Sequence, residues 1–300
     1  MTWAIVPFIN CWELTVLAVH DILEQTVPTR VLLIDQGSDG TTRQAIHELR
    51  MDPDLRRRVL AWHFDPAVPL SAAWNRALQF VADQGETEAW IVNNDVRLFP
   101  HTAEVLSRTR AGRNAYLVSG IGVDEAGWET AQDNLIEPTK FMTDFGGPDF
   151  SNFMLSIEGW RKYPFDERFR PAYCEDVDMH RRMLLAGDSQ KIFGVNVPFW
   201  HPGSATINAM KGGAAAFSPV YETCAAVYAK KWGGKPNKET YREPVEELRA
   251  LTMTEHARHA HLGKQGRGDW TTPHLFGMAR DAYQHVLERV DGPTTRSEPE

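Results

Sequence analysis

The side chains best suited to chemistry stand together in one short polar group, Asn93, Asn94 and Asp95. An apolar run precedes them, and its β-branched residues Ile91 and Val92 without polar alternation predict a strand buried on both faces. In an open α/β sheet, ligands bind beyond the carboxyl ends of the strands, which is where this group falls. A carboxylate beside two amides suits a hard divalent cation that also holds a ligand phosphate. The alternative is an ordinary polar turn, because Asn and Asp are common turn residues.

Strands and helices alternate along the first third of the chain and would carry polar residues to successive strand ends. The expected strands are 3–8, 31–34 and 59–64, and the expected helices are 12–25, 42–51 and one that starts near residue 70. Ser71 is placed to be the N-cap of the last of these helices. Because strand–helix–strand connections are right-handed and join parallel strands, we expect a parallel sheet.

The rest of the chain continues this pattern less regularly. The expected helices are 102–110, 157–162 and 175–186, and the expected strands are 115–120, 151–156 and 191–197. The polar, glycine-rich stretch 123–148 predicts an insertion or a mobile loop. Residues 212–216 predict a flexible join to helical segments at 220–232, 244–259 and 273–290.

Composition limits the class of protein. The chain has 300 residues, of which 42% are hydrophobic, and this is ample for a large packed core. A net charge of −8 argues against a protein that coats nucleic acids, since such proteins are usually basic. Cys11, Cys174 and Cys224 are odd in number and far apart, which favours a reducing, cytoplasmic compartment over a disulfide framework. We expect neither a signal peptide nor a membrane-inserted segment.

Several motifs of the N-terminal half have the residues and spacing of a known family. The turn Asp35-Gln-Gly-Ser-Asp-Gly-Thr is similar to the D-N-G-S-x-D-G-T turn of family 2 glycosyltransferases with the GT-A fold. The helix start Leu70-Ser-Ala-Ala-Trp-Asn-Arg is similar to the segment that ends in R-N-x-G in the family. Asn93-Asn94-Asp95 resembles the metal-binding D-x-D in its N-N-D form.

Further motifs follow in the order of the same family. Phe165-Asp-Glu-Arg-Phe and then Tyr173-Cys-Glu-Asp-Val-Asp are similar to F-D-E-x-F and Y-x-E-D-V-D, which is the most specific part of the resemblance. His201-Pro-Gly-Ser looks like the H-x-x-S that often comes next. The resemblance covers roughly residues 3 to 240.

The resemblance implies a Rossmann-like, mostly parallel α/β sheet flanked by helices, in a GT-A domain over residues 1–210. Its nucleotide-binding half would span about 1–100 and its acceptor half about 101–210, followed by a helical extension at 211–290 and a disordered tail at 291–300. The implied activity is inverting transfer of a sugar from a UDP- or dTDP-linked donor to a hydroxyl acceptor. That acceptor could belong to a glycan, a lipid-linked saccharide, a protein side chain or a modified DNA base.

The resemblance also implies a donor site at the ends of the first strands. Its candidate residues are Pro7, Asn10, Asp35, Gly37, Ser38, Asn75, Asn93 and Asn94. Asp35 would accept hydrogen bonds from the nucleobase or ribose, and the alternative is an Asx-turn or a helix cap. Gly37 and Gly40 permit the backbone angles of a tight turn. Asn75 could equally lie on a solvated helix face.

In the same way, the resemblance implies a metal site. Asp95 would bind Mg²⁺ or Mn²⁺ that bridges the donor diphosphate, with His201 as a further ligand. His201 would otherwise be an ordinary buried residue at the sheet edge. Because Asn93 and Asn94 stand where many relatives carry carboxylates, we expect the cation to bind weakly without the nucleotide.

An inverting transfer needs a base that deprotonates the acceptor hydroxyl opposite the departing diphosphate. Asp176 is our candidate for this base, with Glu175 as its substitute. The alternative is that these acids only complement the dipole of a helix N-terminus. Asp178 points to a different helix face from Asp176 and could pair with Arg181.

The residues that would bind the acceptor are the least clearly indicated by the sequence. We expect Trp128, Asp149 and Asp178 on the acceptor side, because sugar-binding pockets often use aromatic faces and carboxylates. A basic group made of Lys211, Lys230, Lys231, Lys235 and Lys238 could meet a phosphate-bearing acceptor or simply be a solvated surface. The C-terminal helices could pack on their own domain or join two copies in a homo-oligomer.

Two other functions compete with the transferase. A nucleotidyltransferase on a similar sheet would need a glycine-rich, basic phosphate loop near the first strand, and residues 7–10 offer none. A sugar- or nucleotide-binding protein without catalysis is the other reading, against which Asp95, Asp176 and His201 argue.

Overall fold

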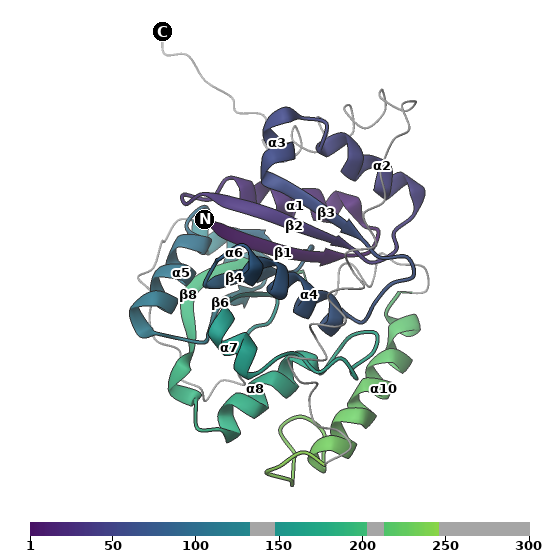
Figure 1. Ribbon diagram of the computed structural model, residues 1–300, viewed down its shortest axis with the longest axis vertical. Coiled ribbons are helices and arrows are strands. Elements are labelled where there is room, and N and C mark those ends of the chain that lie inside the picture. The colour runs from purple at the N-terminus through teal and green to yellow at the C-terminus, as the bar shows by residue number, and fades with distance from the viewer. Residues whose placement is uncertain (133–147, 203–212, 246–300) are drawn as a thin grey trace.

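A mixed sheet forms the centre of the computed structural model, which describes residues 1–132, 148–202 and 213–245 (Figure 1). Eight strands take the order β3-β2-β1-β4-β7-β6-β8-β5. Their bounds are β1 Thr2–Phe8, β2 Thr29–Asp35, β3 Val59–His63, β4 Glu88–Val92, β5 Arg97–Leu98, β6 Leu117–Val123, β7 Asn152–Ser156 and β8 Ile192–Trp200. The expectation of an α/β fold is confirmed.

The direction of the strands changes halfway across the sheet. β3, β2, β1 and β4 are parallel, as the βαβ pattern predicts. β7 is antiparallel to both β4 and β6, because the chain re-enters the sheet at Asn152, which pairs with Val92 at the carboxyl end of β4. β6 and β8 are parallel, and the two-residue strand β5 pairs antiparallel with the end of β8.

Helices cover the sheet on both faces (Figure 1). They are α1 Trp12–Leu23, α2 Gly40–Leu49, α3 Pro53–Arg58, α4 Leu70–Asp83, α5 Thr102–Arg113, α6 Glu125–Gln132, α7 Ile157–Lys162, α8 Glu175–Leu185 and α10 Gly213–Trp232. A short 3-10 turn, Ser189–Lys191, precedes β8.

Four local expectations are wrong. Ser71 does not cap α4; the N-cap position is Pro69, and the Ser71 hydroxyl lies 3.4 Å from the Phe169 carbonyl. α3 was not expected, although Asp52 caps it and Pro53 occupies its first turn. Part of the presumed loop 123–148 is the helix α6. The presumed flexible join at 212–216 is helical from residue 213, so α10 is longer than its apolar pattern predicts.

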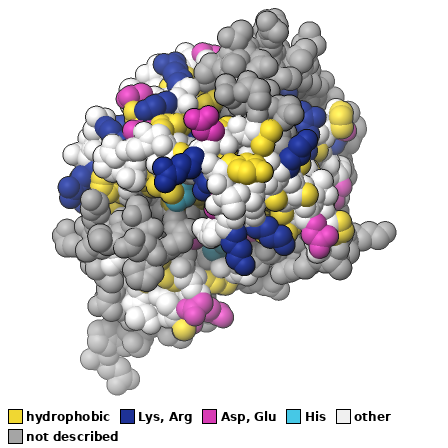
Figure 2. Space-filling view, turned by 90° about the horizontal axis from the view of Figure 1, so that it is seen from below, with side chains coloured by type: hydrophobic (Ala, Val, Ile, Leu, Met, Phe, Trp, Pro, Cys, Tyr) yellow, Lys and Arg dark blue, Asp and Glu magenta, His cyan; other side chains and the backbone are white. Residues whose placement is uncertain are grey.

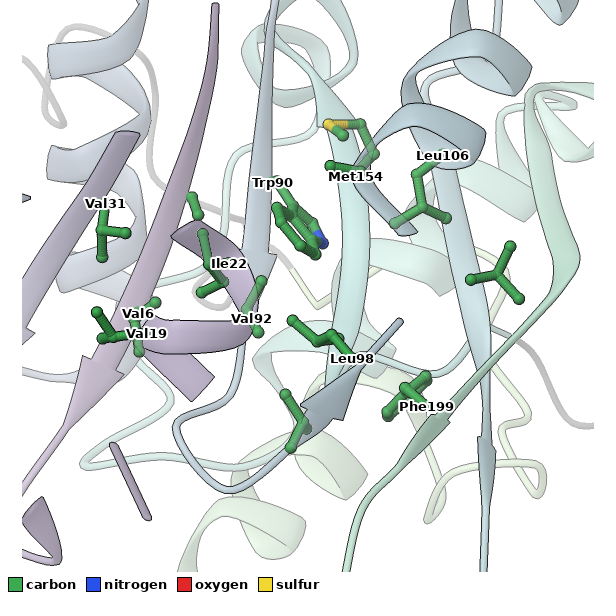
Figure 3. Packing of buried hydrophobic residues seen from close by; sticks show 14 of the residues in the cluster. Val6, Val19, Ile22, Val31, Trp90, Val92, Leu98, Leu106, Met154 and Phe199 are labelled. Carbon is green, nitrogen blue, oxygen red and sulfur yellow. The ribbon is translucent and has the colours of Figure 1, made fainter. Parts of the chain in front are cut away.

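Two apolar layers pack on opposite faces of the sheet. Trp90 and Val92 point into one layer, whereas Ala89 and Ile91 point into the other. Figure 3 shows the first layer, where Trp90 and Val92 lie among side chains of neighbouring strands and helices. β4 is therefore buried on both faces, as its uninterrupted apolar sequence predicts, and each such side chain contributes roughly 1.5–3 kcal/mol on burial.

Strand register brings the candidate site to one edge of the sheet. Phe8 is paired with Asp35, and Asp35 with His63, so the carboxyl ends of β1, β2 and β3 are level. Trp200 at the end of β8 pairs with Arg97, which follows the end of β4 by a few residues. The polar residues beyond these strand ends consequently share one edge.

Parts of the C-terminal expectations fall outside the described residues. These are all but the first two residues of the helix expected at 244–259, the helix at 273–290, the tail at 291–300, and Lys211 in the basic group. Within the described ranges, no helix combines the length and apolar character that crossing a bilayer requires.

Candidate functional site

Asp95 and His201 meet at the carboxyl edge of the sheet although they follow different strands. Asp95 comes just after β4 and His201 directly after β8, and His201 Nε2 lies 3.4 Å from Asp95 Oδ1. The other ring nitrogen, Nδ1, is 3.3 Å from the Ser151 hydroxyl. Ser151 is fixed in turn by its carbonyl, which accepts a hydrogen bond of 2.9 Å from the Asn93 amide. The tertiary structure thus joins the two residues expected to hold a cation.

The pKa of His201 is shifted by the groups around it. Burial lowers the pKa of His201, but the hydrogen bond to Asp95 and the negative charges of Asp95 and Asp149 outweigh burial, so the pKa is raised. Protonated His201 and ionised Asp95 therefore stabilise each other when no cation separates them.

The spacing of this pair is compatible with a divalent cation. Two neighbouring ligands of an octahedral ion, each at about 2.1 Å, are roughly 3.0 Å apart. The 3.4 Å between His201 Nε2 and Asp95 Oδ1 is close to that value. Among the residues that the structure describes, however, no group of three or more His, Cys, Asp or Glu side chains is arranged for a metal ion. The described residues therefore supply two ligands here, and a bound diphosphate or water could supply others.

A second acidic group, Asp149 and Asp176, lies beside this pair. Asp149 accepts a hydrogen bond of 2.9 Å from the Ser151 amide, and its charge raises the pKa of both His201 and Asp176. For Asp176, burial is the largest cause of the raised pKa, while the Val177 amide, which donates to Asp176 Oδ1 at 2.7 Å, opposes it. The start of α8 therefore brings a carboxyl group with a raised pKa to the same edge as Asp95 and His201.

Glu175 and Asp176 differ in exposure despite being adjacent. Glu175 is only 3% exposed, and its Oε2 accepts no hydrogen bond within the described part of the chain. Burial, together with the charges of Asp176 and Asp178, holds the pKa of Glu175 well above its usual range. Asp176 is half-buried and is the more accessible of the two carboxyl groups. The geometry favours Asp176 over Glu175 for contact with a ligand.

The expectation that Asp178 faces the acceptor is wrong. Asp178 is 0% exposed and lies 2.6 Å from Lys231 Nζ. It also pairs with Arg182 at 2.8 Å rather than with Arg181, because residues four apart share a helix face. Its position two residues after Asp176 turns it into the protein interior.

Lys231 likewise corrects the expectation of a surface basic group. Its side chain is fully buried, so it cannot meet an acceptor phosphate, whereas the adjacent Lys230 is exposed. Figure 2 shows Lys and Arg side chains in several separate clusters on the face seen from below, scattered among hydrophobic ones.

The loops after β1 and β2 are linked by hydrogen bonds from candidate donor-site residues. The Asn10 amide donates to Ser38 Oγ at 2.7 Å, and Asn10 Oδ1 accepts from the Asp39 amide at 2.9 Å. Pro7 is buried in β1, where it pairs with Ile34 of β2. These residues shape the loops at the predicted donor site, and direct contact with a donor stays a prediction.

Asp35 is buried in the same edge, and its carboxylate has three partners, of which Arg43 Nε is the most distant, at 3.9 Å from Oδ2. Its Oδ1 accepts a hydrogen bond of 2.8 Å from the Ser38 amide, as in the Asx-type turn considered for it. Its Oδ2 lies 2.5 Å from His63 Nδ1. The cap of α2 is Asp39 instead, which accepts from the Thr42 amide.

The two glycines of this turn have different roles. Gly37 has a φ of +87°, and a Cβ there would lie 3.3 Å from the Phe64 carbonyl oxygen, so the turn requires glycine. Gly40 is the first residue of α2, has no positive φ and has open space around it. The prediction for Gly37 is confirmed and that for Gly40 is wrong.

Asn75 joins two parts of the structure through its side chain. Nδ2 donates to the Phe165 carbonyl at 2.8 Å and to Glu167 Oε1 at 3.1 Å, while Oδ1 accepts from Trp160 Nε1 at 3.0 Å and from the Phe165 amide at 3.1 Å. Because all four hydrogen-bonding capacities have protein partners, Asn75 has none to offer a nucleotide. It is also buried rather than on a solvated helix face.

Two further candidates make contacts within the protein. Asn94 is buried, and its Nδ2 donates to Thr15 Oγ1 of α1 at 3.0 Å. The ring of Trp128 in α6 lies against that of Phe99, with 4.2 Å between centroids. Trp128 follows the end of β6 at the same edge of the sheet, but no contact joins it to Asp149 among the described interactions.

Sequence reasoning missed two residues of this edge, His63 and Ser151, and it took the buried Lys231 of α10 for a surface charge. His63 ends β3, so the same strand-end rule that selects Asp35 and Asp95 would have selected it. Ser151 stands next to the expected strand at 151–156, but a serine at a strand start carries no distinctive signal. Lys231 belongs to a charged run, which gives no indication of burial.

Comparison with known proteins supports the fold. No protein-family model matches the chain, and no curated protein matches it. Among solved structures, S. aureus TarS 1-349 aligns over 67% of this chain and 60% of that one, with 14% identity and a TM-score of 0.50. The chain thus spans less than two thirds of TarS in that alignment. The TarS complex with UDP-GlcNAc aligns over 75% of this chain and 66% of that one, with 14% identity and a TM-score of 0.51. The complex with UDP aligns over 100% and 94%, with 12% identity and a TM-score of 0.50.

TarS is a family 2 glycosyltransferase with the GT-A fold. At 12–14% identity, this likeness concerns architecture alone. The chain has a GT-A-like fold, as its sequence motifs predict.

Proposed function

We propose that this protein is a glycosyltransferase that moves a sugar from a nucleotide-diphosphate sugar to a hydroxyl acceptor. The observation that carries this proposal is the meeting of Asp95 and His201 with Asp149 and Asp176 at one sheet edge. The GT-A-like fold supports it, and so does the likeness to TarS, which has been solved with UDP-GlcNAc.

The proposed donor lies at the ends of β1, β2 and β4 and carries uridine or thymidine. Both bases carry an N–H group from which a carboxylate such as Asp35 can accept a hydrogen bond. Asp35 would need to accept this bond beside those from Ser38 and His63, which a carboxylate with two oxygens allows. The linked loops around Asn10 and Ser38 support this position because they fix the backbone next to Asp35.

We propose that Asp95 and His201 hold Mn²⁺ or Mg²⁺ together with the donor diphosphate. The cation would neutralise negative charge that develops on the diphosphate as the sugar–phosphate bond breaks. Asp95 contributes the hard carboxylate oxygen, and His201 binds only in its neutral form. Since the described part of the chain offers two ligands here, donor and cation should bind together rather than separately.

The proposed base is Asp176. In an inverting transfer the acceptor oxygen bonds to the anomeric carbon as the bond to the diphosphate breaks, and the acceptor proton passes to the base. A raised pKa brings Asp176 closer to the neutral range in which a general base works best. Asp149, which accepts from the Ser151 amide nearby, is the proposed polar contact for the acceptor.

The test measures thermal stability with UDP, UDP-sugars and dTDP-sugars, each with and without Mn²⁺, and then release of UDP or dTDP from the responding donor. We expect cation-dependent stabilisation by one donor, lost in Asp95→Ala. No response to any donor would overturn the proposal. Stabilisation without release, with acceptors supplied from each hydroxyl class, would favour a binding protein, and pyrophosphate release from a nucleoside triphosphate and a sugar phosphate would indicate a nucleotidyltransferase.

A further inference from the structure

The buried lysine of α10 links two carboxylates from different parts of the chain. Lys231 Nζ lies 2.7 Å from Asp166 Oδ2 and 2.6 Å from Asp178 Oδ1. Lys231 and Asp178 are each 0% exposed, and Asp166 is 1% exposed. Lysine and aspartate are rarely buried unless paired, so this arrangement requires all three residues together.

Two arginines and a tryptophan complete the hydrogen bonding of these carboxylates. Arg168 binds both oxygens of Asp166, at 2.9 Å each. Arg182 Nε donates to Asp178 Oδ2 at 2.8 Å, and Trp232 Nε1 donates to Asp178 Oδ1 at 2.9 Å. We call this group the α8–α10 junction, and it consists of Asp166, Arg168, Asp178, Arg182, Lys231 and Trp232. Three cations thus face two carboxylates, and hydrogen bonds satisfy the oxygens, as a buried ion pair needs.

Apolar contacts extend the same junction along the loop before α8. Phe169, Cys174, Cys224, Tyr228 and Trp232 form one buried cluster. Cys224 Sγ also lies 3.2 Å from the Arg170 carbonyl and 3.0 Å from that of Ala172. Figure 1 shows α10 running beside this loop and α8. Helix α10 consequently contacts the chain from residue 166 through the first turn of α8.

The loop before α8 ends in two residues with unfavourable backbone conformations, which contacts with the rest of the protein must stabilise. Tyr173 has a φ of 83° and Cys174 a φ of 70°, in the left-handed region that non-glycine residues rarely adopt. Such backbone conformations are unfavourable and persist only where the surroundings fix them. Glu175 and Asp176 follow immediately, and Asp178, in the same turn, is the residue that Lys231 binds.

We propose that Lys231 is a positioning residue for Asp176: by binding Asp166 and Asp178 it fixes the first turn of α8 and thereby the direction of the Asp176 carboxyl group. This inference rests on the proposed function, in which Asp176 is the base. It makes α10 a part of the active site rather than an appended helix. Lys231 itself touches neither donor nor acceptor, because it is buried on the far side of α8 from Asp176.

The test compares three variants. Lys231→Met keeps the length and apolar stem but removes the charge. Lys230→Met changes the neighbouring exposed lysine and is the matched control. The double variant Lys231→Met with Asp178→Asn also neutralises the carboxylate that loses its lysine, so that stability recovers in part while the link to α8 stays broken. Each is measured for hydrogen exchange of peptides covering 166–178, donor binding, thermal stability, and kcat and KM.

We expect Lys231→Met and the double variant to exchange amides of 166–178 faster and to lose about 10- to 100-fold in kcat, since small displacements of a catalytic group have effects of this size. Donor affinity should stay at the wild-type value, as should every property of Lys230→Met. A double variant that regains wild-type kcat together with stability would overturn the proposal, because Lys231 would then be merely structural.

Two further results keep the inference separate from the proposed function. If the wild-type protein transfers no sugar, the proposed function fails. Hydrogen exchange tests the inference separately, because unchanged exchange at 166–178 in the Lys231 variants would overturn the link from Lys231 to α8. If both Lys231 variants fail to fold, Asp166→Asn keeps Lys231 in place and removes the charge of one of its two carboxylate partners. A wild-type kcat in that variant, with wild-type exchange at 166–178, would contradict the inference.

Discussion

The two sides of the candidate site are held in place by different kinds of contact. At the donor edge, which we define as Asn10, Asp35, Ser38, Asp39 and His63, the links are hydrogen bonds within and between the loops and strand ends of β1, β2 and β3. At the α8–α10 junction, carboxylates are held by full positive charges, one of which comes from a helix far along the chain, with Lys231 65 positions after Asp166. Neighbouring strand ends need only short polar links, whereas the start of α8 depends on a distant element.

The difference has an energetic reason. A hydrogen bond contributes about 0.5–1.5 kcal/mol net, or about 1.5–3 kcal/mol when one partner is charged, so losing one at the donor edge has a limited effect. Removing one partner of a buried ion pair costs about 3–5 kcal/mol, because the other charge stays buried and unpaired. The α8–α10 junction is therefore the more sensitive region, although it lies behind the ligand-facing surface.

The largest expected effect falls on catalysis. Asp176→Asn keeps the shape of the side chain and removes its capacity to accept a proton, so the transfer rate should drop about 10²- to 10⁴-fold. Donor binding, measured by thermal shift, should be unchanged. Transfer at the wild-type rate would show that Asp176 is not the base and would leave Glu175 as the alternative.

A pair of stability measurements tests the comparison directly. Asp178→Ala leaves Lys231 and Arg182 buried without their carboxylate and should reduce the free energy of unfolding by about 3–5 kcal/mol. Asp39→Ala at the donor edge removes only the cap of α2 and should cost about 1 kcal/mol. Urea denaturation of both variants gives the two values, and equal losses would contradict the distinction between the two regions.

The metal-dependent part of donor binding is expected to need Asp95. With donor at 100 times its Kd, binding stabilises the wild type by about 2.7 kcal/mol, and Asp95→Ala should lose most of the increment that Mn²⁺ adds. His201→Ala should lose less, since Asp95 still supplies the charged ligand. Thermal shifts at matched donor concentrations measure this, and an unchanged Mn²⁺ increment in Asp95→Ala would exclude the residue as a ligand.

Glu175 offers a pH-dependent test. Because its folded-state pKa is raised, the folded protein binds this proton more tightly than the unfolded chain, and stability falls as pH rises from the usual carboxyl range through the folded pKa. Glu175→Gln should therefore stabilise the protein by about 1–2 kcal/mol at pH 8, within the range for relieving a buried unsatisfied group. The gain should shrink toward pH 4. A gain that is constant with pH would mean that ionisation of Glu175 is not its cause.

The smallest effects distinguish the two glycines of the donor-edge turn. Gly37→Ala should cost about 1–2 kcal/mol, because L-residues resist a positive φ and the new Cβ would approach the Phe64 carbonyl. Gly40→Ala should be neutral or stabilise by up to roughly 1 kcal/mol, since it adds a better helix former in open space. Chemical denaturation checks both, and a destabilised Gly40→Ala protein would be the unexpected result.

Local sequence determined the parts of this protein that depend on periodicity and position. The apolar run before Asn93 predicts a strand buried on both faces, and β4 is one. The same reasoning predicts that Asp35 and Asp95 lie beyond strand ends and that a helix starts at Glu175. These features follow from backbone alternation and from the termini of elements, which neighbouring residues largely decide.

Only the tertiary structure decided which polar side chains face a ligand and which face the interior. Asn75 and Asp178 belong to motifs that resemble donor and acceptor elements, yet both are buried and fully engaged by other residues. Lys231 reads as a surface charge and is buried beside Asp178. The reason is physical: a buried charge or amide is stable only with its partners, and those partners come from chain segments whose proximity no local pattern encodes.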